Sequence, residues 1–165
     1  MDLGKLRGLK KLIDEEVQLY SKLKSLFQEK RKILISNKVD DLLIVDEKIL
    51  NIVDSIKSSV NLRERISEQP ENKQLTLSQI IAEAEKYDKD LAHEFSLAQQ
   101  EVHTLIKEIA HEEMVIKELL RHGMNLVNKT LNMISNAAAI AGEYNSAGKN
   151  THSEIDRISS VIEEV

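Results

Sequence analysis

Cysteine and tryptophan are absent from this chain of 165 residues, which also has a single proline, five glycines and only 3% aromatic residues. The absence of cysteine excludes disulfide bonds and metal sites built on thiolates, and it is consistent with a reducing, cytoplasmic environment. One proline leaves little to interrupt helices, and the charged fraction of 31% favours long amphipathic helices over a compact α/β domain. So few aromatic side chains also indicate a thin core, of the kind that a partner protein often completes.

Long apolar stretches and an excess of positive charge are missing as well. The longest wholly apolar run is AAAIA at 137–141, far below the roughly 20 residues of a membrane-spanning helix. The N-terminal MDLGKLRGLKKLIDEE has no continuous apolar core, so we expect no signal peptide and no stable membrane insertion. A net charge of -5, with no basic block interleaved with aromatics, argues against nucleic acid as a partner.

What the sequence does contain is helical periodicity. A first apolar stripe recurs every seven residues, at Leu12, Leu19, Leu26 and Ile33. A second stripe alternates steps of three and four, as a coiled-coil seam does, at Leu42, Val45, Ile49, Ile52 and Ile56. Between them the segment 34–42 is interrupted at Ser36–Asn37, where neither residue is glycine or proline. The pattern leaves open whether this interruption is a kink in one long helix or a full reversal of the chain.

The clearest break is SEQPENKQLT at 67–76, because Pro70 cannot sit inside a helix and its neighbours are polar. Thr76 and Gln79 then form a capping box that predicts the start of a helix, and we find no strong stop before Gly142. We therefore predict an all-α fold: a long antiparallel helical hairpin or a left-handed coiled-coil bundle of three to four helices over residues 1–142. Residues 143–165 are expected to form a mobile tail, with a short amphipathic helix in its second half.

Three patterns resemble active sites, and each is incomplete. Glu108 and His111 have the spacing of a di-iron ligand pair, but no second Glu-x-x-His is present. The HEEMV at 111–115 lacks the second histidine of a zinc protease. His103 is followed by Lys107 one residue later than in histidine-phosphotransfer helices, and Glu108 stands where a small residue is needed. We therefore expect no enzymatic activity, no metal and no cofactor.

The segment HGMNLVNKTLNMISN at 122–136 stands out as a candidate interaction surface. Its apolar stripe is flanked by four asparagines, which are poor helix formers, at Asn125, Asn128, Asn132 and Asn136. Small residues follow over 137–141 and permit close approach of another helix, while an asparagine can fix the register of a helix pair. Two interpretations fit the pattern equally: a polar flank near a helix end, or a groove that binds a partner helix.

In these features the chain resembles the FlgN-like family of flagellar type III export chaperones. The family's long first helix is similar to residues 19–66, with a run rich in Lys and Arg, a short polar interruption, repeated Leu and Ile, and a closing arginine. Its Asn-x-x-Asn-x-x-Leu motif is matched by Asn125, Asn128 and Leu131, and its tail tyrosine and glycine by Tyr144 and Gly148. The resemblance covers about residues 6–148 and leaves 153–165 unmatched. The sequence lacks the glycine that the family often has at the interruption.

The resemblance implies a cytoplasmic chaperone that binds the C-terminal helical segments of hook-filament junction (hook-associated) proteins. Such a chaperone prevents their premature assembly and delivers them to the type III export gate or its ATPase complex. The resemblance and the groove interpretation together assign client binding to Asn125, Asn128, Val127, Leu131, Ile134 and Ala138. The resemblance alone assigns docking on the export gate to Tyr144 and Gly148. The alternative is a structural coiled-coil tether or homo-oligomeric scaffold, and a homodimer stays open in either case.

Overall fold

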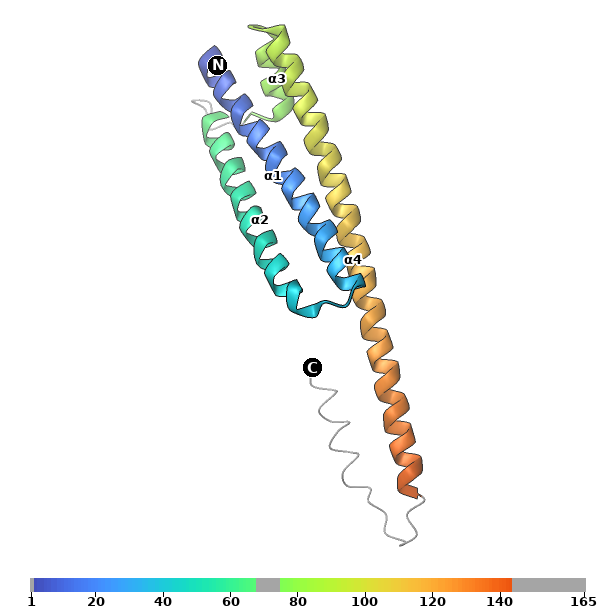
Figure 1. Cartoon of the computed structure of the whole chain (residues 1–165). Helices are drawn as coiled ribbons and strands as arrows, with labels where there is room; N and C mark the ends of the chain where they lie inside the picture. Colours follow the sequence, from blue (N-terminus) through green and yellow to red (C-terminus); the bar gives the residue numbers. More distant parts are fainter. Residues whose placement is uncertain (1, 68–74, 144–165) are drawn as a thin grey trace. The chain divides into compact units, whose positions relative to one another are not determined.

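The computed structural model describes residues 2–67 and 75–143, and for residue 39 and residues 138–143 it describes the backbone only. These residues form four helices and no strand: α1 (Leu3–Ile35), α2 (Val39–Ser67), α3 (Leu77–Glu85) and α4 (Lys89–Glu143) (Figure 1). The chain divides into two compact units, Met1–Lys117 and Glu118–Val165, which we describe separately. The predicted all-α bundle is confirmed. None of the described helices is long and apolar enough to cross a membrane.

The interruption at Ser36–Asn37 is a full reversal of the chain. Asn37 takes a left-handed conformation with φ of 55°, which asparagine tolerates better than most residues. The Lys38 N–H donates to the Ile33 carbonyl and the Asn37 N–H to the Leu34 carbonyl, both at 3.2 Å. This pair of hydrogen bonds is the Schellman motif that usually ends at a glycine. Asparagine thus replaces the missing glycine, and the kink interpretation is wrong.

Ion pairs across the two helices define an antiparallel register for α1 and α2. Lys30 Nζ lies 2.6 Å from Asp46 Oδ1 near the turn, and Arg63 Nε lies 2.8 Å from Glu16 Oε1 far from it. The apolar stripes predicted from sequence face this interface, since Ile33 on α1 and the residues Val45 and Ile56 on α2 are buried. The two helices therefore bury one seam between them, as expected for a coiled-coil pair.

The helix expected from Thr76 to Gly142 is in fact two helices. The capping box is confirmed, with Gln79 N donating to Thr76 Oγ1 at 3.3 Å and Thr76 N to Gln79 Oε1 at 2.9 Å. However, α3 ends at Glu85 and α4 begins at Lys89. Asp88 caps the new helix, because its Oδ1 accepts from the Asp90 and Leu91 N–H groups at 3.0 and 3.2 Å. The prediction of one helix was wrong because it overlooked this aspartate, which is a strong N-cap residue.

The main apolar core of the first unit lies where α1, α3 and α4 meet. Phe95 is fully buried and is the largest side chain there. The other buried members of the cluster are Leu6, Leu9, Ile13, Ile80, Ala84, Leu91, Ala92 and Ala98. Four of these nine residues are alanine or leucine from α3 and α4, so a single phenylalanine supplies the bulk that fills the space between three helices. The thin, aromatic-poor core expected from composition is therefore present.

Helices α1 and α4 run in the same direction along this unit. Lys10 pairs with Glu94 at 3.8 Å, Lys24 with Glu108 at 2.8 Å, and Arg31 with Glu112 at 3.2 Å. The partner numbers rise together along both helices, which is the signature of a parallel pair. Figure 1 shows α1 between α2 and α4 over much of the first unit.

Two glutamates occupy positions that would otherwise belong to the core. Glu16 and Glu112 are both buried. Glu16 on α1 pairs with Arg63 on α2, and Glu112 on α4 pairs with Arg31 on α1. Near Glu16 and Arg63, burial raises the pKa of the Tyr20 hydroxyl above its ordinary value of 10.0. The negative charge of Glu16 raises this pKa further, and the positive charge of Arg63 lowers it. These buried charges therefore interrupt apolar seams of the bundle.

Candidate functional site

The second unit exposes its helix on every side. Each residue from Glu118 to Ala137 is exposed, although many of them are large and apolar. The exposed large apolar side chains of this part of α4 are Leu119, Leu120, Met124, Leu126, Val127, Leu131, Met133 and Ile134. A helix with so much apolar surface is normally buried against other helices. In the described residues nothing covers it, which marks it as the candidate interaction surface.

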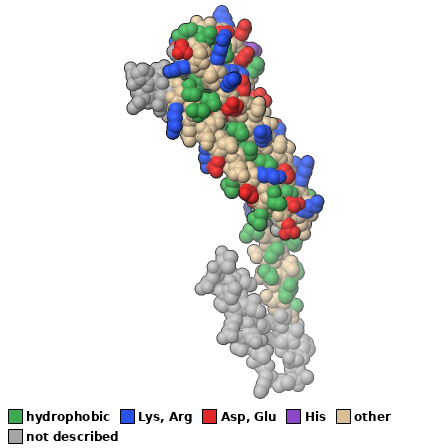
Figure 2. Space-filling view, turned by 60° about the vertical axis from the view of Figure 1, so that its left-hand side comes forward, with side chains coloured by type: hydrophobic (Ala, Val, Ile, Leu, Met, Phe, Trp, Pro, Cys, Tyr) green, Lys and Arg blue, Asp and Glu red, His purple; other side chains and the backbone are tan. Residues whose placement is uncertain are grey.

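Figure 2 shows the contrast between the two units on one face of the molecule. Blue and red charged side chains are scattered over the first unit, as on an ordinary soluble surface. Close to the grey residues, the visible part of α4 shows green apolar side chains among tan ones. The charged surface of the bundle thus gives way to an apolar one along the same helix.

The client-binding residues expected from sequence lie on this surface. Val127, Leu131 and Ile134 are 57%, 42% and 60% exposed. Together with Leu120 and Met124 they form one line along α4, which we call the Asn-flanked seam. Asn125 and Asn128 are exposed beside it. Their side chains make no hydrogen bond within the described residues, so their amide groups are available to another molecule.

Three further expected site residues are outside the part of the chain whose side chains the structure describes. The backbone of Ala138 lies within α4, and its position continues the Asn-flanked seam, but its side chain is not described. Tyr144 and Gly148, the expected gate-docking residues, and the expected amphipathic segment 153–165 lie outside the described residues.

A second apolar line on the same helix was missed by the sequence analysis. Leu119, Leu126 and Met133 recur every seven residues and are exposed, and we call this line the second seam. The heptad repeat of these residues is visible in the sequence. It was overlooked because the neighbouring apolar stripe is sufficient by itself to predict an amphipathic helix. Residues seven apart lie almost above one another on a helix, so this seam runs beside the first without merging with it.

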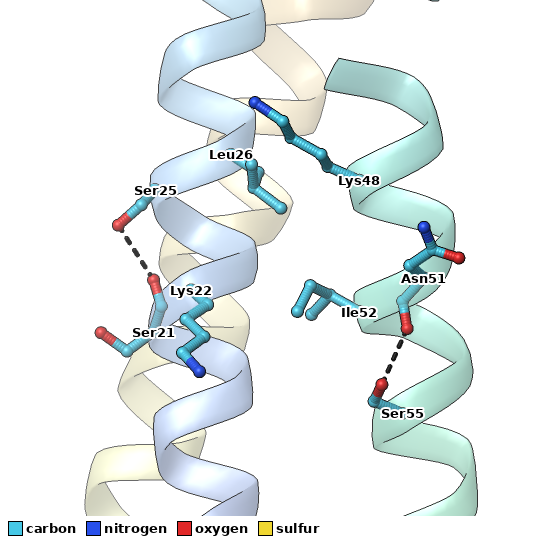
Figure 3. Close-up of a pocket in the computed structure, with 8 residues that line it drawn as sticks. All are labelled: Ser21, Lys22, Ser25, Leu26, Lys48, Asn51, Ile52 and Ser55. Atoms are coloured by element: carbon cyan, nitrogen blue, oxygen red, sulfur yellow. Dashed lines mark hydrogen bonds between the residues drawn. The ribbon is translucent and has the colours of Figure 1, made fainter. Parts of the chain in front are cut away.

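The first unit contains an open groove between α1 and α2, of about 530 Å³. Figure 3 shows Leu26 and Ile52 pointing toward each other across it, with serines on both rims. The Ser25 hydroxyl donates to the Ser21 carbonyl at 3.1 Å, and the Ser55 hydroxyl to the Asn51 carbonyl at 2.8 Å. These hydroxyls are satisfied by their own helices, and no Asp, Glu or His is among the residues that line the groove. Its arrangement supports packing rather than chemistry.

The residues weighed as catalytic or metal-ligating are not brought together. Glu108 forms an ion pair with Lys24 Nζ at 2.8 Å, and His103 and His111 are exposed on α4. Among the residues that the structure describes, no group of three or more His, Asp or Glu side chains is placed to hold a metal ion. Glu108 is therefore part of the contact between α1 and α4.

Comparison with known proteins identifies the family. A family model described as FlgN protein matches residues 1–152, which is most of the chain. No curated protein and no solved structure matches the chain. FlgN proteins are non-enzymatic, cytoplasmic chaperones that serve the flagellar export of hook-associated proteins. The chain belongs to the FlgN family and is a flagellar export chaperone for hook-associated proteins, without catalytic activity.

Proposed function

We propose that the Asn-flanked seam of α4 receives the C-terminal helical segment of a hook-associated protein. The observation that carries this proposal is the exposure of Val127, Leu131 and Ile134 along a helix with no cover in the described residues. An amphipathic client helix would bury these side chains in the way that helices dock into apolar grooves. Keeping a client's apolar helix covered is what prevents its premature assembly.

The exposed apolar surface of this seam supplies only part of the free energy that a client complex needs. Covering the exposed part of four or five half-exposed apolar side chains contributes roughly 1 kcal/mol each, on the scale of a fully buried aliphatic side chain. Hydrogen bonds from Asn125 and Asn128 contribute about 1 kcal/mol each. The total of about 6 kcal/mol is less than the roughly 8 kcal/mol of a micromolar complex, before the cost of association. Further contacts are therefore needed, and release at the export apparatus remains easy.

Binding of a client peptide to substituted chains tests this proposal. Leu131→Ser combined with Ile134→Ser should weaken binding of a C-terminal helical peptide of a hook-associated protein by about tenfold or more, measured by calorimetry. Leu43→Ser is the matched control, because Leu43 is 79% exposed but lies on α2. Both variants should keep the helical circular dichroism of the parent chain. Equal affinity for the two variants would remove the seam from the client site.

We propose in addition that Tyr144 and Gly148 dock the loaded chaperone on the export gate or its ATPase complex. This assignment rests on the family's tail tyrosine and glycine, and on the place of both residues directly after α4. The accompanying domain proposal is a helical part over 1–142 and a tail over 143–165. Tyr144→Ala should abolish binding to the cytoplasmic part of the gate while client affinity stays unchanged. Retained gate binding would reject the assignment.

A homodimer is the alternative use of the same apolar surface. Two copies that paired through α4 would cover each other's seams, and a client would then have to displace the partner copy. Analytical ultracentrifugation over a wide concentration range separates the cases. A client-free monomer supports the seam as an open client site, whereas a dimer that dissociates on client binding supports the competing arrangement.

A further inference from the structure

The second seam on α4 has no role in client binding as proposed above. Leu126 and Met133 are 62% and 70% exposed, and the sequence continues the same heptad with Ile140. One helical partner covers one apolar stripe, about 100° of a helix surface. Two adjoining stripes on one helix therefore indicate two helical neighbours, one for each seam.

A line of small residues separates the two seams. Gly123, Thr130 and Ala137 also recur every seven residues. A Cβ added at Gly123 would meet nothing within 4 Å, so no contact in the described structure requires glycine there. A glycine inside an exposed helix costs about 1 kcal/mol relative to alanine. Small side chains at this line let a helix on the second seam lie close to the α4 backbone.

We infer that residues 153–165 of the same chain fold back as a helix onto the second seam. Four apolar residues of this segment recur in steps of three and four, at Ile155, Ile158, Ile162 and Val165. The family match ends at residue 152, so this segment lies outside the matched residues. Alone it is too short to be stable as a helix and needs an apolar surface to pack on.

The chain between α4 and this segment is long enough for the reversal. α4 ends at Glu143, and residues 144–152 can span up to about 30 Å when extended. A hairpin centred on Gly148 places Ile158 opposite the 137–140 stretch and Ile162 opposite Met133. A helix over 153–165 is about 20 Å long, and it covers the second seam from about residue 130 to the end of α4.

Charge selects the second seam over the Asn-flanked seam. The segment has four acidic residues, Glu154, Asp156, Glu163 and Glu164, and one basic residue, Arg157. Lys129 borders the second seam, on the side away from the Asn-flanked seam, and it has no acidic partner within the described residues. Arg121, on the asparagine side, is already paired with Glu118 at 2.7 Å. An acidic helix therefore gains a cation on the second seam.

This arrangement leaves the Asn-flanked seam open while the tail covers its neighbour. The use of the open seam by a client rests on the proposed function, whereas the packing of the tail on the second seam does not. The tail and α4 then form a two-helix platform, and the client adds a third helix to it. Such a platform supplies the additional contacts that the Asn-flanked seam by itself lacks.

Chemical cross-linking tests the arrangement in the full-length chain and without a client. Because the chain has no native cysteine, cysteine pairs can be introduced cleanly and joined with a short bismaleimide. The test pair is Met133→Cys with Ile162→Cys. The matched pairs combine Ile162→Cys with Leu131→Cys on the Asn-flanked seam, or with Asn132→Cys on the polar face.

The test pair should cross-link within one chain about tenfold faster than either matched pair, because packing raises the local concentration of the two thiols. Adding Lys129→Glu to the test pair should slow the reaction severalfold. Equal rates for all three pairs would refute the docking of the tail. Faster reaction with Leu131→Cys would show that the tail covers the client seam, and cross-linked dimers would show that a second copy occupies the second seam. Both results overturn the inference, whereas the proposed function is tested separately by client binding to the chain with Leu131→Ser and Ile134→Ser.

Discussion

The Glu16–Arg63 ion pair joins α1 to α2 across residues far apart in sequence, and its removal gives a quantitative test of the fold. The two side chains lie 2.8 Å apart and are only 5% and 19% exposed. We consider Glu16→Leu and Arg63→Met, which replace each charge by an apolar group of similar size. Measuring both single variants and the double variant isolates the energy that depends on the pair.

The structure predicts unequal costs for the two single changes. Arg63→Met leaves the Glu16 carboxylate almost fully buried without its cation, which should cost about 3–4 kcal/mol of unfolding free energy. Glu16→Leu leaves a guanidinium that is more exposed and can move toward water, so about 2 kcal/mol is expected. The double variant removes both charges from the seam and should cost about 1 kcal/mol or less. The resulting coupling energy is about 4 kcal/mol or more.

Urea unfolding followed by circular dichroism measures these energies. The m-value should be the same in all four proteins, so that differences in midpoint report stability alone. Additive single changes, with a coupling energy below about 0.5 kcal/mol, would refute the reasoning. That result would mean that the pair does not form and that the antiparallel register of α1 and α2 is different.

Three further changes probe the core, the turn and the pH dependence. Phe95→Ala should cost about 3–5 kcal/mol in thermal or urea unfolding, whereas the exposed neighbour Leu97→Ala should cost under about 1 kcal/mol; similar costs would contradict the packing of α3 on α1 and α4. Asn37→Ala should cost about 1 kcal/mol because of its left-handed backbone, whereas Asn37→Gly should be neutral or stabilising; equal stability of the two would contradict the turn. The pKa of Tyr20 is raised above 10.0. The stability that the neutral Tyr20 hydroxyl contributes is therefore fully present below pH 10.0 and is lost as pH rises through the pKa of the folded state. Tyr20→Phe should therefore show a smaller alkaline fall in the unfolding midpoint than the parent chain, and an identical fall would exclude Tyr20 as the cause.

The sequence predicted the elements of the fold well because its signals were local. The capping box at Thr76 and the two apolar stripes around Ser36–Asn37 depend on residues close together, and the structure confirms them. The reversal at Asn37 was left open because both kinks and turns use short polar interruptions. The break before Asp88 was missed because an aspartate between two apolar stripes reads as an ordinary solvated residue unless its capping role is considered.

The candidate site was predicted only in part, for a different reason. An apolar stripe on a helix indicates that something covers it, but the sequence does not say whether the cover is the same domain or another molecule. Phe95 is buried and Leu131 is exposed, but both belong to one apolar stripe that continues along α4. Only the arrangement of α1 and α3 shows where the internal cover stops. The buried Glu16 escaped notice because a charge in a seam is recognisable only once its arginine partner is placed beside it.

The measurement that tests the central claim most directly is client binding by a chain carrying Asn125→Ala and Asn128→Ala. Both asparagines are exposed beside the Asn-flanked seam, and alanine is the better helix former by roughly 0.6 kcal/mol for each residue. We predict that the helix becomes slightly more stable while affinity for the client's C-terminal helix falls by about tenfold or more, through the loss of two hydrogen bonds. Unchanged affinity, or a loss of stability in the free chaperone, would contradict the assignment of this surface to client binding.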